Sequence, residues 1–298
     1  MIRSSLGDKA MSVVIYGFLL ILGFTTFYPF WNAVVISFNS GMDTVKGGIT
    51  FWPRDFSLDN YAVVFKDSRL INGFLISVLR TAVGTASAIL ATAIFAYGMS
   101  MRELMGRKGY MVVCVITMYF GGGLIPTFLL IRELGLMNTF WVMVVPGLIS
   151  VWNMIIFRTF FLGLPSGLEE AAKIDGCTNW GVLFRIVLPL SGPVIATLSL
   201  FTAVYHWNDW FAPGIYISNI DLLPIQTKLQ QILSSNIMSE QMSQMDSAAQ
   251  SHLNQMKTVT TKSLTMATMV VATLPILCVY PFVQKYFVKG VLVGSLKE

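Results

Sequence analysis

Near its middle the chain reads Glu170-Ala171-Ala172-Lys173-Ile174-Asp175-Gly176, and after nine further residues it continues Ile186-Val187-Leu188-Pro189. This polar stretch lies between apolar segments that are long enough to cross a bilayer, which takes about 20 residues. Good helix formers run from Glu170 to Ile174, with the small Ala171 and Ala172 on one side, and Gly176 is free to adopt the positive φ that ends a helix. The sequence therefore predicts a short, rigid helix-turn-helix elbow that projects from a membrane, with Pro189 beginning the return.

The composition is that of an integral membrane protein. Hydrophobic residues make up 55% of the 298 residues and charged residues only 12%, about half of what soluble domains carry. The net charge is +5, but the basic residues are spread among the loops, which argues against a nucleic-acid partner. The three cysteines and two histidines form neither a disulfide framework nor a metal-binding spacing, so we expect no metal site.

Six apolar segments predict an all-α integral membrane protein with six transmembrane helices. Their approximate limits are 12–36, 72–98, 110–131, 139–162, 191–216 and 264–284. We expect the whole chain, 1–298, to be a single transmembrane domain. Its main polar parts are the elbow at about 166–189, an outer loop at about 217–263 and a tail at 285–298. The first segment is too long for the apolar region of a secretory signal, so we expect it to remain as a span.

The distribution of lysine and arginine predicts the orientation. With both termini in the cytoplasm, the inner segments carry 11 of the 20 basic residues and the outer segments 8, most of them in two long loops that the positive-inside rule discounts. Among the short connections, Arg102, Arg107 and Lys108 lie inside and Arg132 alone lies outside. We therefore expect both termini in the cytoplasm, which also places the elbow there, where ATP is.

The elbow resembles the cytoplasmic coupling loop of ABC importer permeases. From about residue 72 onward, the chain resembles the smaller permease of carbohydrate-uptake ABC importers, of which the maltose-transporter permease is a member. It is most similar to the lipoprotein-associated sugar permeases of Gram-positive bacteria. The supporting stretches are Gly121-Gly122-Gly123-Leu124-Ile125-Pro126, Asn138-Thr139, Trp207-Asn208-Asp209-Trp210 and the tail from Gln284 to Gly290. One departure is Cys177, where relatives commonly have alanine; cysteine is also small, so we expect the packing to survive.

The resemblance implies a type I importer fold and a set of partners in a bacterial cell membrane. These are a second, homologous permease, two ATPase subunits, an extracellular solute-binding lipoprotein, the sugar substrate and membrane lipid. ATP and magnesium would be bound by the partner ATPase, so the chain would have no cofactor of its own and would not be an enzyme. The residues implied in ATPase coupling are Glu170, Ala171, Ala172, Asp175 and Gly176. Those implied in a tail that contacts the ATPase are Gln284, Lys285, Lys289 and Gly290.

Polar residues within the spans are candidates for the translocation pathway. Arg80 and Asp209 are charges at membrane depth, where a charge is costly and usually faces a cavity or a partner. From the 1.5 Å rise of a helix we place both about 9–10 Å below the outer surface and predict that they pair. The aromatic and amide residues around Asp209 that could receive a sugar are Tyr205, Trp207, Asn208 and Trp210. Attachment of one helix to another and an interfacial aromatic belt are the structural alternatives, and His206 is expected to be a packed core residue.

The predicted function is that of a permease subunit of an ATP-driven importer for carbohydrate, by analogy an oligosaccharide. A peptide or phosphate importer is the alternative within the same class. A secondary transporter should show buried acids along its path and repeated halves, but Asp209 is the one acid expected well inside a span. A membrane enzyme would need paired acids, a histidine cluster or an activated nucleophile, and the chain has no Walker motif for ATP hydrolysis.

Overall fold

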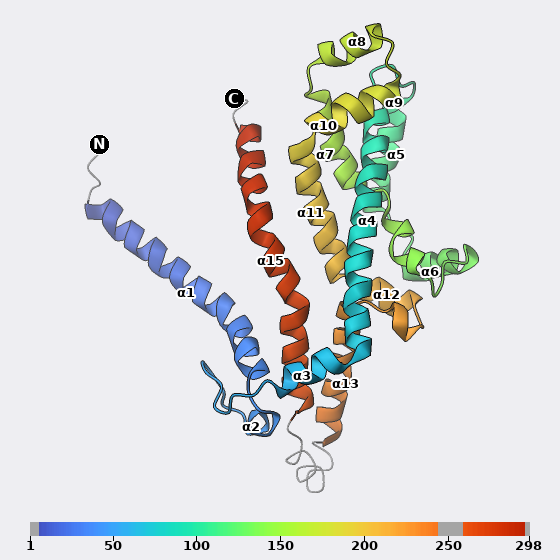
Figure 1. Ribbon diagram of the computed structural model, residues 1–298. Helices are drawn as coiled ribbons and strands as arrows, with labels where there is room; N and C mark the ends of the chain where they lie inside the picture. Colours follow the sequence, from blue (N-terminus) through green and yellow to red (C-terminus); the bar gives the residue numbers. More distant parts are fainter. Residues whose placement is uncertain (1–5, 244–258, 296–298) are drawn as a thin grey trace. The chain divides into compact units, whose positions relative to one another are not determined.

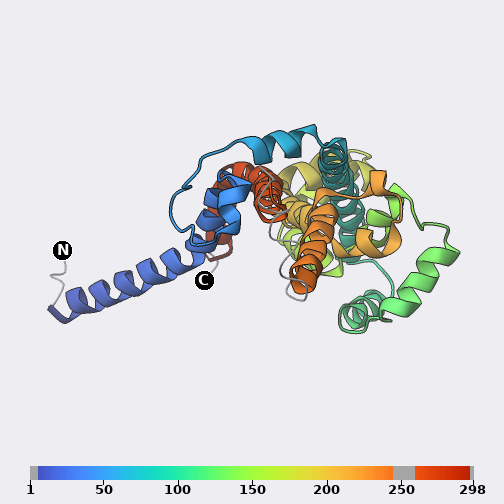
Figure 2. The same ribbon diagram turned by 90° about the horizontal axis from the view of Figure 1, so that it is seen from below.

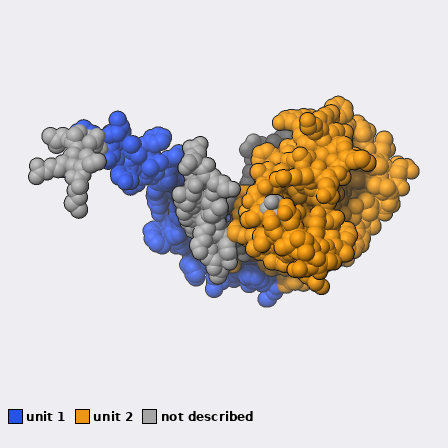
Figure 3. Space-filling view, turned by 90° about the horizontal axis from the view of Figure 1, so that it is seen from above, with its two compact units in different colours: residues 1–68, 229–273 blue, residues 69–228, 274–298 orange. Residues whose placement is uncertain are grey.

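The structure is a computed structural model that describes residues 6–243 and 259–295, with residues 236–243 and 279–295 described by their backbone alone (Figure 1). The described residues form helices joined by short connections, and their β-structure is limited to one isolated bridge between Asn39 and Phe56. The chain divides into two compact units, residues 1–68 with 229–273 and residues 69–228 with 274–298 (Figure 3). The first unit is built on one long exposed helix and the second on a helical core.

The first unit has a small apolar core at one end of its long helix. Its elements are α1 (Leu6–Ser37), α2 (Gly41–Val45), α3 (Asp59–Lys66) and the beginning of α15 (Thr261–Ser295). The core residues, which gather at the Ser37 end of α1, are Trp31, Val35, Ile36, Ile49 and Met266.

Buried asparagines tie the connection after α1 to the start of α15. The Asn60 amide donates to the carbonyls of Ser37 (3.0 Å) and Asn39 (2.9 Å). The side-chain oxygen Oδ1 of Asn60 accepts from Ser263 Oγ at 2.8 Å. Asn39 in turn accepts from the backbone of Asp55 at 3.0 Å. A buried polar group without a partner costs about 1–3 kcal/mol, so these contacts fix the path of the segment.

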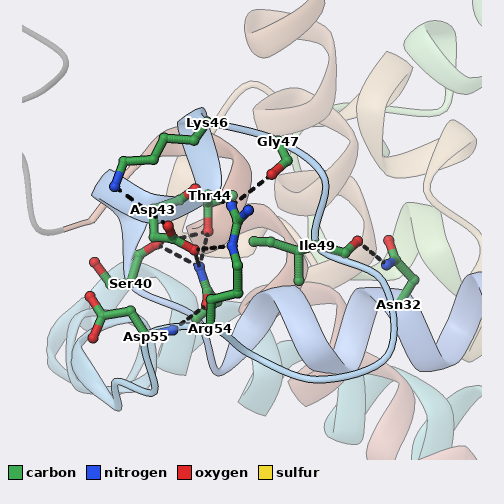
Figure 4. A network of polar contacts seen from close by, with 10 residues as sticks. Asn32, Ser40, Asp43, Thr44, Lys46, Gly47, Ile49, Arg54 and Asp55 are labelled. Carbon is green, nitrogen blue, oxygen red and sulfur yellow. Dashed lines mark hydrogen bonds and ion pairs between the residues drawn. The ribbon is translucent and has the colours of Figure 1, made fainter.

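Residues 39–58 form a folded segment through a second set of polar contacts. Arg54 Nε donates to Asp43 Oδ2 at 2.9 Å, and Arg54 Nη2 donates to the Gly47 carbonyl at 2.7 Å (Figure 4). Lys46 Nζ lies 3.6 Å from the other oxygen of Asp43 (Figure 4). The segment between α2 and α3 is therefore held at both of its ends.

The second unit contains the remaining helices. They are α4 (Ser68–Ser100), α5 (Arg107–Tyr119), α6 (Leu124–Glu133), α7 (Val151–Leu162), α8 (Ser166–Ile174), α9 (Asn179–Val182), α10 (Leu188–Leu190), α11 (Gly192–Asn208), α12 (Phe211–Tyr216) and the first turn of α13 (Ile225–Ser243). Shorter turns of 3₁₀ helix lie at Phe140–Met143, Val145–Gly147 and Ile220–Leu222, and a π-helical turn lies at Leu183–Val187.

Helix α4 organises the core of this unit. Small residues recur on it every four positions and all are buried, namely Gly84, Ala88, Thr92 and Ala96. Residues at that spacing lie on one face of a helix, and their small size lets neighbouring helices approach closely. The main core at this face includes Ala93, Met154, Phe157, Phe161, Leu183 and Leu198.

Three helical segments are long and apolar enough to cross a membrane, namely Met11–Ser37, Ser68–Ser100 and Thr261–Cys278. Three more spans are possible if each bent pair of helices is one span. The pairs are Arg107–Tyr119 with Leu124–Glu133 (bent by 113°), Phe140–Gly147 with Val151–Leu162 (47°) and Asn179–Leu190 with Gly192–Asn208 (82°). The expected number of six spans therefore agrees with the structure when each bent pair counts once, although the last pair includes residues 179–190, most of which the sequence places in the elbow.

Two of the expected spans, 110–131 and 191–216, are interrupted helices in the structure. The first is interrupted at residues 120–123, where Gly123 has a φ of +88°, and Figures 1 and 2 show α5 and α6 meeting at the resulting bend. The second is interrupted at Asp209 and Trp210. In both places the helix stops at residues that favour a non-helical backbone. One is a run of glycines, and the other is an aspartate whose side chain bonds to the backbone amides that follow it.

Candidate functional site

The predicted elbow is present and ends as expected. Helix α8 closes with bonds from the amides of Asp175 to the Ala171 carbonyl (3.0 Å) and of Gly176 to the Lys173 carbonyl (3.1 Å). Gly176 has a φ of +81°, which is the left-handed region that favours glycine. The turn after α8 is therefore set by the backbone at this one residue.

The two alanines of the elbow point to different sides. Ala172 is buried in the core with Val182 and Leu183, whereas Ala171 is exposed. The expectation that both lie on one side is wrong, because adjacent helical positions are about 100° apart. Ala172 anchors α8, and half-buried Cys177 packs against the same core.

The exposed side of α8 and the turn that follows it carry the remaining predicted coupling residues. Glu170, Ala171, Asp175 and Gly176 are all exposed. Ile174 lies among them with 86% of its surface exposed, and the sequence reasoning did not single it out. The available signal was an isoleucine at the end of an otherwise polar helix. Among the residues that the structure describes, none covers this face.

The second half of the elbow returns the chain through an abrupt turn. Thr178 Oγ1 caps α9 by accepting from the Gly181 amide at 3.2 Å. The helix then bends by 82° between Leu190 and Gly192. Buried Ser191 stands at this bend, and its hydroxyl donates to the Val187 carbonyl at 2.6 Å. The turn thus lies two residues after Pro189, where the sequence placed the return.

Arg80 and Asp209 form the predicted ion pair inside the second unit. The Arg80 side chain is 1% exposed and that of Asp209 12%. Arg80 Nη2 pairs with Asp209 Oδ2, and Arg80 Nη1 donates to the Asp209 backbone carbonyl at 2.7 Å. Contact with both the carboxylate and the main chain fixes Asp209 more firmly than an ion pair alone would.

Asp209 also begins the next helix. Its Oδ1 accepts from the backbone amides of Phe211 and Ala212, each at 3.1 Å. These amides are at the start of α12, where helix donors lack partners inside the helix. One aspartate therefore ends α11, caps α12 and holds the cation of α4. The sequence predicted the pair but not this capping role.

His206 packs against Gly84 one turn along from the pair. His206 is buried, as expected, and a methyl group built on Gly84 would lie 2.7 Å from its Nε2. Its other ring nitrogen, Arg80 Nε and the hydroxyls of Thr81 and Thr85 have no hydrogen-bond partner among the described residues. The pair therefore belongs to a polar region that the protomer's described atoms do not fully satisfy.

Gly84→Ala is expected to destabilise the protein by about 1–3 kcal/mol, because the buried imidazole must shift to admit a methyl group. Gly98→Ala is the matched control, since it lies on the same helix and nothing stands within 4 Å of the added carbon. Thermal unfolding of the purified protein, followed by tryptophan fluorescence, should show a lower Tm for the first variant and an unchanged or higher Tm for the second. Equal Tm values would contradict the close contact.

The Arg80–Asp209 pair belongs to a row of contacts along α4. We call the α4 residues that make these contacts the α4 seam; they are Gly73, Ser77, Arg80 and Gly84. These residues are all buried and lie on one face of α4 at intervals of three or four. Ser77 Oγ accepts from the Ile225 amide at 2.9 Å, and a methyl group on Gly73 would lie 2.9 Å from a carbon of Lys228. The sequence reasoning missed Ser77 and Lys228, although small or polar residues at helical spacing were the signal.

The aromatic candidates around Asp209 divide into two groups. Tyr205, Asn208 and Trp210 are exposed. Trp207 is buried, with its ring edge-on to Phe74 at a centroid distance of 5.7 Å. The side chains of the predicted tail residues lie outside the described ones, although their backbone belongs to α15; they are Gln284, Lys285, Lys289 and Gly290. Within the described part of the chain, no group of three or more His, Cys, Asp or Glu residues could hold a metal ion.

Comparison with known proteins gives a consistent result. The family model described as binding-protein-dependent transport system inner membrane component matches residues 88–293. The polygalacturonan/rhamnogalacturonan transport system permease YtcP of Bacillus subtilis is 42% identical over 97% of this chain and 99% of its own length. The arabinooligosaccharides transport system permease AraQ of Halalkalibacterium halodurans is 27% identical over 93% of each chain. A chain of a bacterial ABC transporter that imports the acidic polysaccharide alginate shares the fold, with a TM-score of 0.86, 24% identity and coverage of 96% of this chain and all of that one.

Proposed function

Because this chain belongs to the family of binding-protein-dependent transport system inner membrane components, we propose that it is the permease of an ATP-driven importer of oligosaccharides. The family consists of transport permeases and not of catalytic subunits, and the expected all-α permease fold is confirmed. The observation that carries the substrate class is the 42% identity to a permease named for polygalacturonan and rhamnogalacturonan. Oligosaccharides released from such acidic plant polysaccharides are therefore the first substrates to test.

The elbow supports coupling to a cytoplasmic ATPase. Its exposed face, with Glu170, Ala171 and Ile174, stands on a short helix that is anchored by Ala172 and closed by Gly176. A rigid element of this kind passes on a movement that a flexible loop would absorb. We place one ATPase subunit on this face and a second on the equivalent face of a homologous permease. The tail around Lys285 and Lys289 is a further proposed contact, and an extracellular lipoprotein would deliver the sugar.

The substrate pathway is proposed to pass the exposed groups beside Asp209. Aromatic rings such as those of Tyr205 and Trp210 suit the apolar faces of sugars, and the Asn208 amide can bond a hydroxyl. Arg80 and Trp207 are buried in this conformation, so they would support the path from behind. Asp209 both pairs with buried Arg80 and lies close to the proposed path.

Both termini are proposed to lie in the cytoplasm. A cysteine placed at Lys46, which is exposed beside α2, should then react with a membrane-impermeant maleimide in intact cells. A cysteine at Ile174 should react only after the membrane is opened, because the elbow would be inside. The background would lack the native Cys114, Cys177 and Cys278. Labelling of position 174 in intact cells would contradict the orientation.

Uptake by the purified complex tests the function directly. The permease should copurify with an ATPase, and the complex in proteoliposomes should accumulate an oligogalacturonide only when ATP and the solute-binding protein are present. Arabino-oligosaccharide, a peptide and phosphate serve as competing substrates. Uptake driven by an ion gradient without ATP would favour a secondary transporter, and ATP-driven uptake of peptide or phosphate alone would overturn the sugar assignment.

A further inference from the structure

Helix α1 changes its surroundings abruptly near Trp31. From Met11 to Phe30 all side chains are exposed except that of Tyr28, which is half-buried. From Trp31 to Ser37 no side chain is exposed. The change lies six residues before the helix ends, which is about 9 Å at 1.5 Å per residue. One helix therefore has an uncovered apolar part and a covered part.

The covered part begins where the segment after α2 returns to the helix. Asn32 Nδ2 donates to the carbonyls of Ile49 (3.0 Å) and Thr50 (3.1 Å), and Figure 4 shows the bond to Ile49. Trp31 Nε1 donates to the Phe51 carbonyl at 3.0 Å. Non-helical backbone of this kind is not tolerated in contact with hydrocarbon. The non-helical backbone that bonds to α1 at Trp31 therefore requires polar surroundings.

Aromatic rings gather at the same level. The Phe51 ring lies 5.4 Å from that of Tyr28, and the Trp52 ring lies edge-on to that of Trp31 at 5.9 Å. We name these four residues the aromatic collar. Trp52 is 73% exposed and Phe51 48%, so the collar presents large rings outward from α1. The bonds of Asp43 and Arg54 hold the segment that carries them, so the exposed rings are in fixed positions.

We propose that the aromatic collar is a lipid-contact surface seated in the headgroup layer, and that the edge of the hydrocarbon crosses α1 between Tyr28 and Trp31. Tryptophan and tyrosine favour this layer because their rings are apolar and their polar atoms can reach water or headgroups. The exposed part of the helix, residues 11–30, would be about 30 Å long, which is the thickness of the hydrocarbon. In the proposed orientation this is the outer leaflet. The expected span of 12–36 would then be too long at its outer end.

Another protein is the competing explanation for exposed rings. Lipid accounts for the collar because it lies at the level where the exposed apolar part of α1 ends and the helix begins to bond to non-helical backbone. Thr25 and Thr26 in that exposed part bond to the helix carbonyls of Ile21 and Leu22, which removes their need for water.

Spin-label accessibility tests the position of the collar in the complete importer, reconstituted in phosphatidylglycerol–phosphatidylethanolamine nanodiscs. Nitroxides would be placed by Trp52→Cys, Gly17→Cys as the hydrocarbon reference and Lys46→Cys as the water reference. The ratio of collisions with oxygen to collisions with a water-soluble nickel chelate should be intermediate at position 52. A ratio equal to that at position 46, or exclusion of both agents as in a protein interface, would overturn the proposal.

A second measurement does not depend on a cysteine in the collar. In nanodiscs of lipid brominated near the headgroup end of the acyl chains, Trp52→Phe should lower the quenched fraction of the tryptophan emission. Trp207→Phe should raise that fraction, because it removes a buried indole that the bromine cannot reach. If Trp52→Phe leaves the fraction unchanged or raises it, Trp52 does not contact lipid at this depth.

Discussion

Replacing Arg80 with leucine is expected to remove most of the folded permease from the membrane. The change leaves the Asp209 carboxylate, whose side chain is 12% exposed, without its cation. Breaking a buried pair from one side typically costs about 3–5 kcal/mol, and each 1.4 kcal/mol is a factor of about ten in an equilibrium. The loss should be visible as a smaller monodisperse peak in fluorescence-detected size-exclusion chromatography and as a lower Tm.

Further variants separate the charge of the pair from its geometry. Asp209→Asn keeps an oxygen that can cap α12 but leaves Arg80 unpaired, so we expect it to destabilise as well. Combining Arg80→Leu with Asp209→Asn removes both charges and keeps the cap, and this double variant should be more stable than Arg80→Leu alone. The exchange Arg80→Asp with Asp209→Arg should recover only a small part, because arginine has no acceptor for the amides of Phe211 and Ala212.

Two outcomes would count against this account of the pair. Arg102→Leu, which changes an exposed arginine, is the control and should leave the Tm within error of the parent. If Arg80→Leu behaves in the same way, the pair does not stabilise the protein. If the double variant is less stable than Arg80→Leu, the two charges do not act through each other.

Gly176→Pro is expected to abolish uptake while the permease stays in the membrane. Proline fixes φ near −65°, whereas Gly176 has a φ of +81°, and proline also lacks the amide that bonds to the Lys173 carbonyl. A misplaced proline costs about 3 kcal/mol or more, which corresponds to roughly a hundredfold smaller population of the intact elbow. Gly176→Ala should have a smaller effect, since a left-handed alanine costs about 1–2 kcal/mol.

Glu170→Lys tests the same surface without disturbing the backbone. Glu170 is exposed on α8, so its reversal should leave folding intact and still stop uptake by blocking the proposed contact with an ATPase. Gly167→Ala is the matched control, because it lies on the same helix with open space around the added carbon. The measurements are ATP-driven uptake in proteoliposomes and the amount of ATPase that copurifies. Uptake at the parental rate in either Gly176→Pro or Glu170→Lys would contradict the proposed coupling role of the elbow.

The elbow was predictable because its structure is local. Helix formers from Glu170 onward, a glycine that can take a positive φ and a proline at the return are read from neighbouring residues alone. Which side of α8 is buried was harder to predict, because burial of Ala172 depends on residues that follow it by ten or more positions. Ile174 was overlooked for the same reason, since only the packed structure shows which residues of a short helix remain uncovered.

The number of spans followed from hydropathy, whereas their interruptions did not. A window of about 19 residues averages over a break of a few positions. The glycines at 121–123 and the cap at Asp209 were therefore hidden inside apolar segments. The Arg80–Asp209 pair was predicted from equal depth, but its bond to the Asp209 main chain requires α4 and the end of α11 to be in place.

The sequence alone determined those features that depend on neighbouring residues or on overall composition. They depend on the length of apolar chain needed to cross the hydrocarbon, on helix propensity and on the conformational freedom of glycine. The all-α membrane fold and the elbow were predictable on this basis, and the family resemblance was read from the motifs themselves. Only the tertiary structure decided that Asp209 caps α12, that small and polar residues of α4 form one seam, and that residues 49–52 return to α1. Each of these joins groups far apart in the chain, and the free energy of such contacts exists only once a desolvated interior has brought their atoms together.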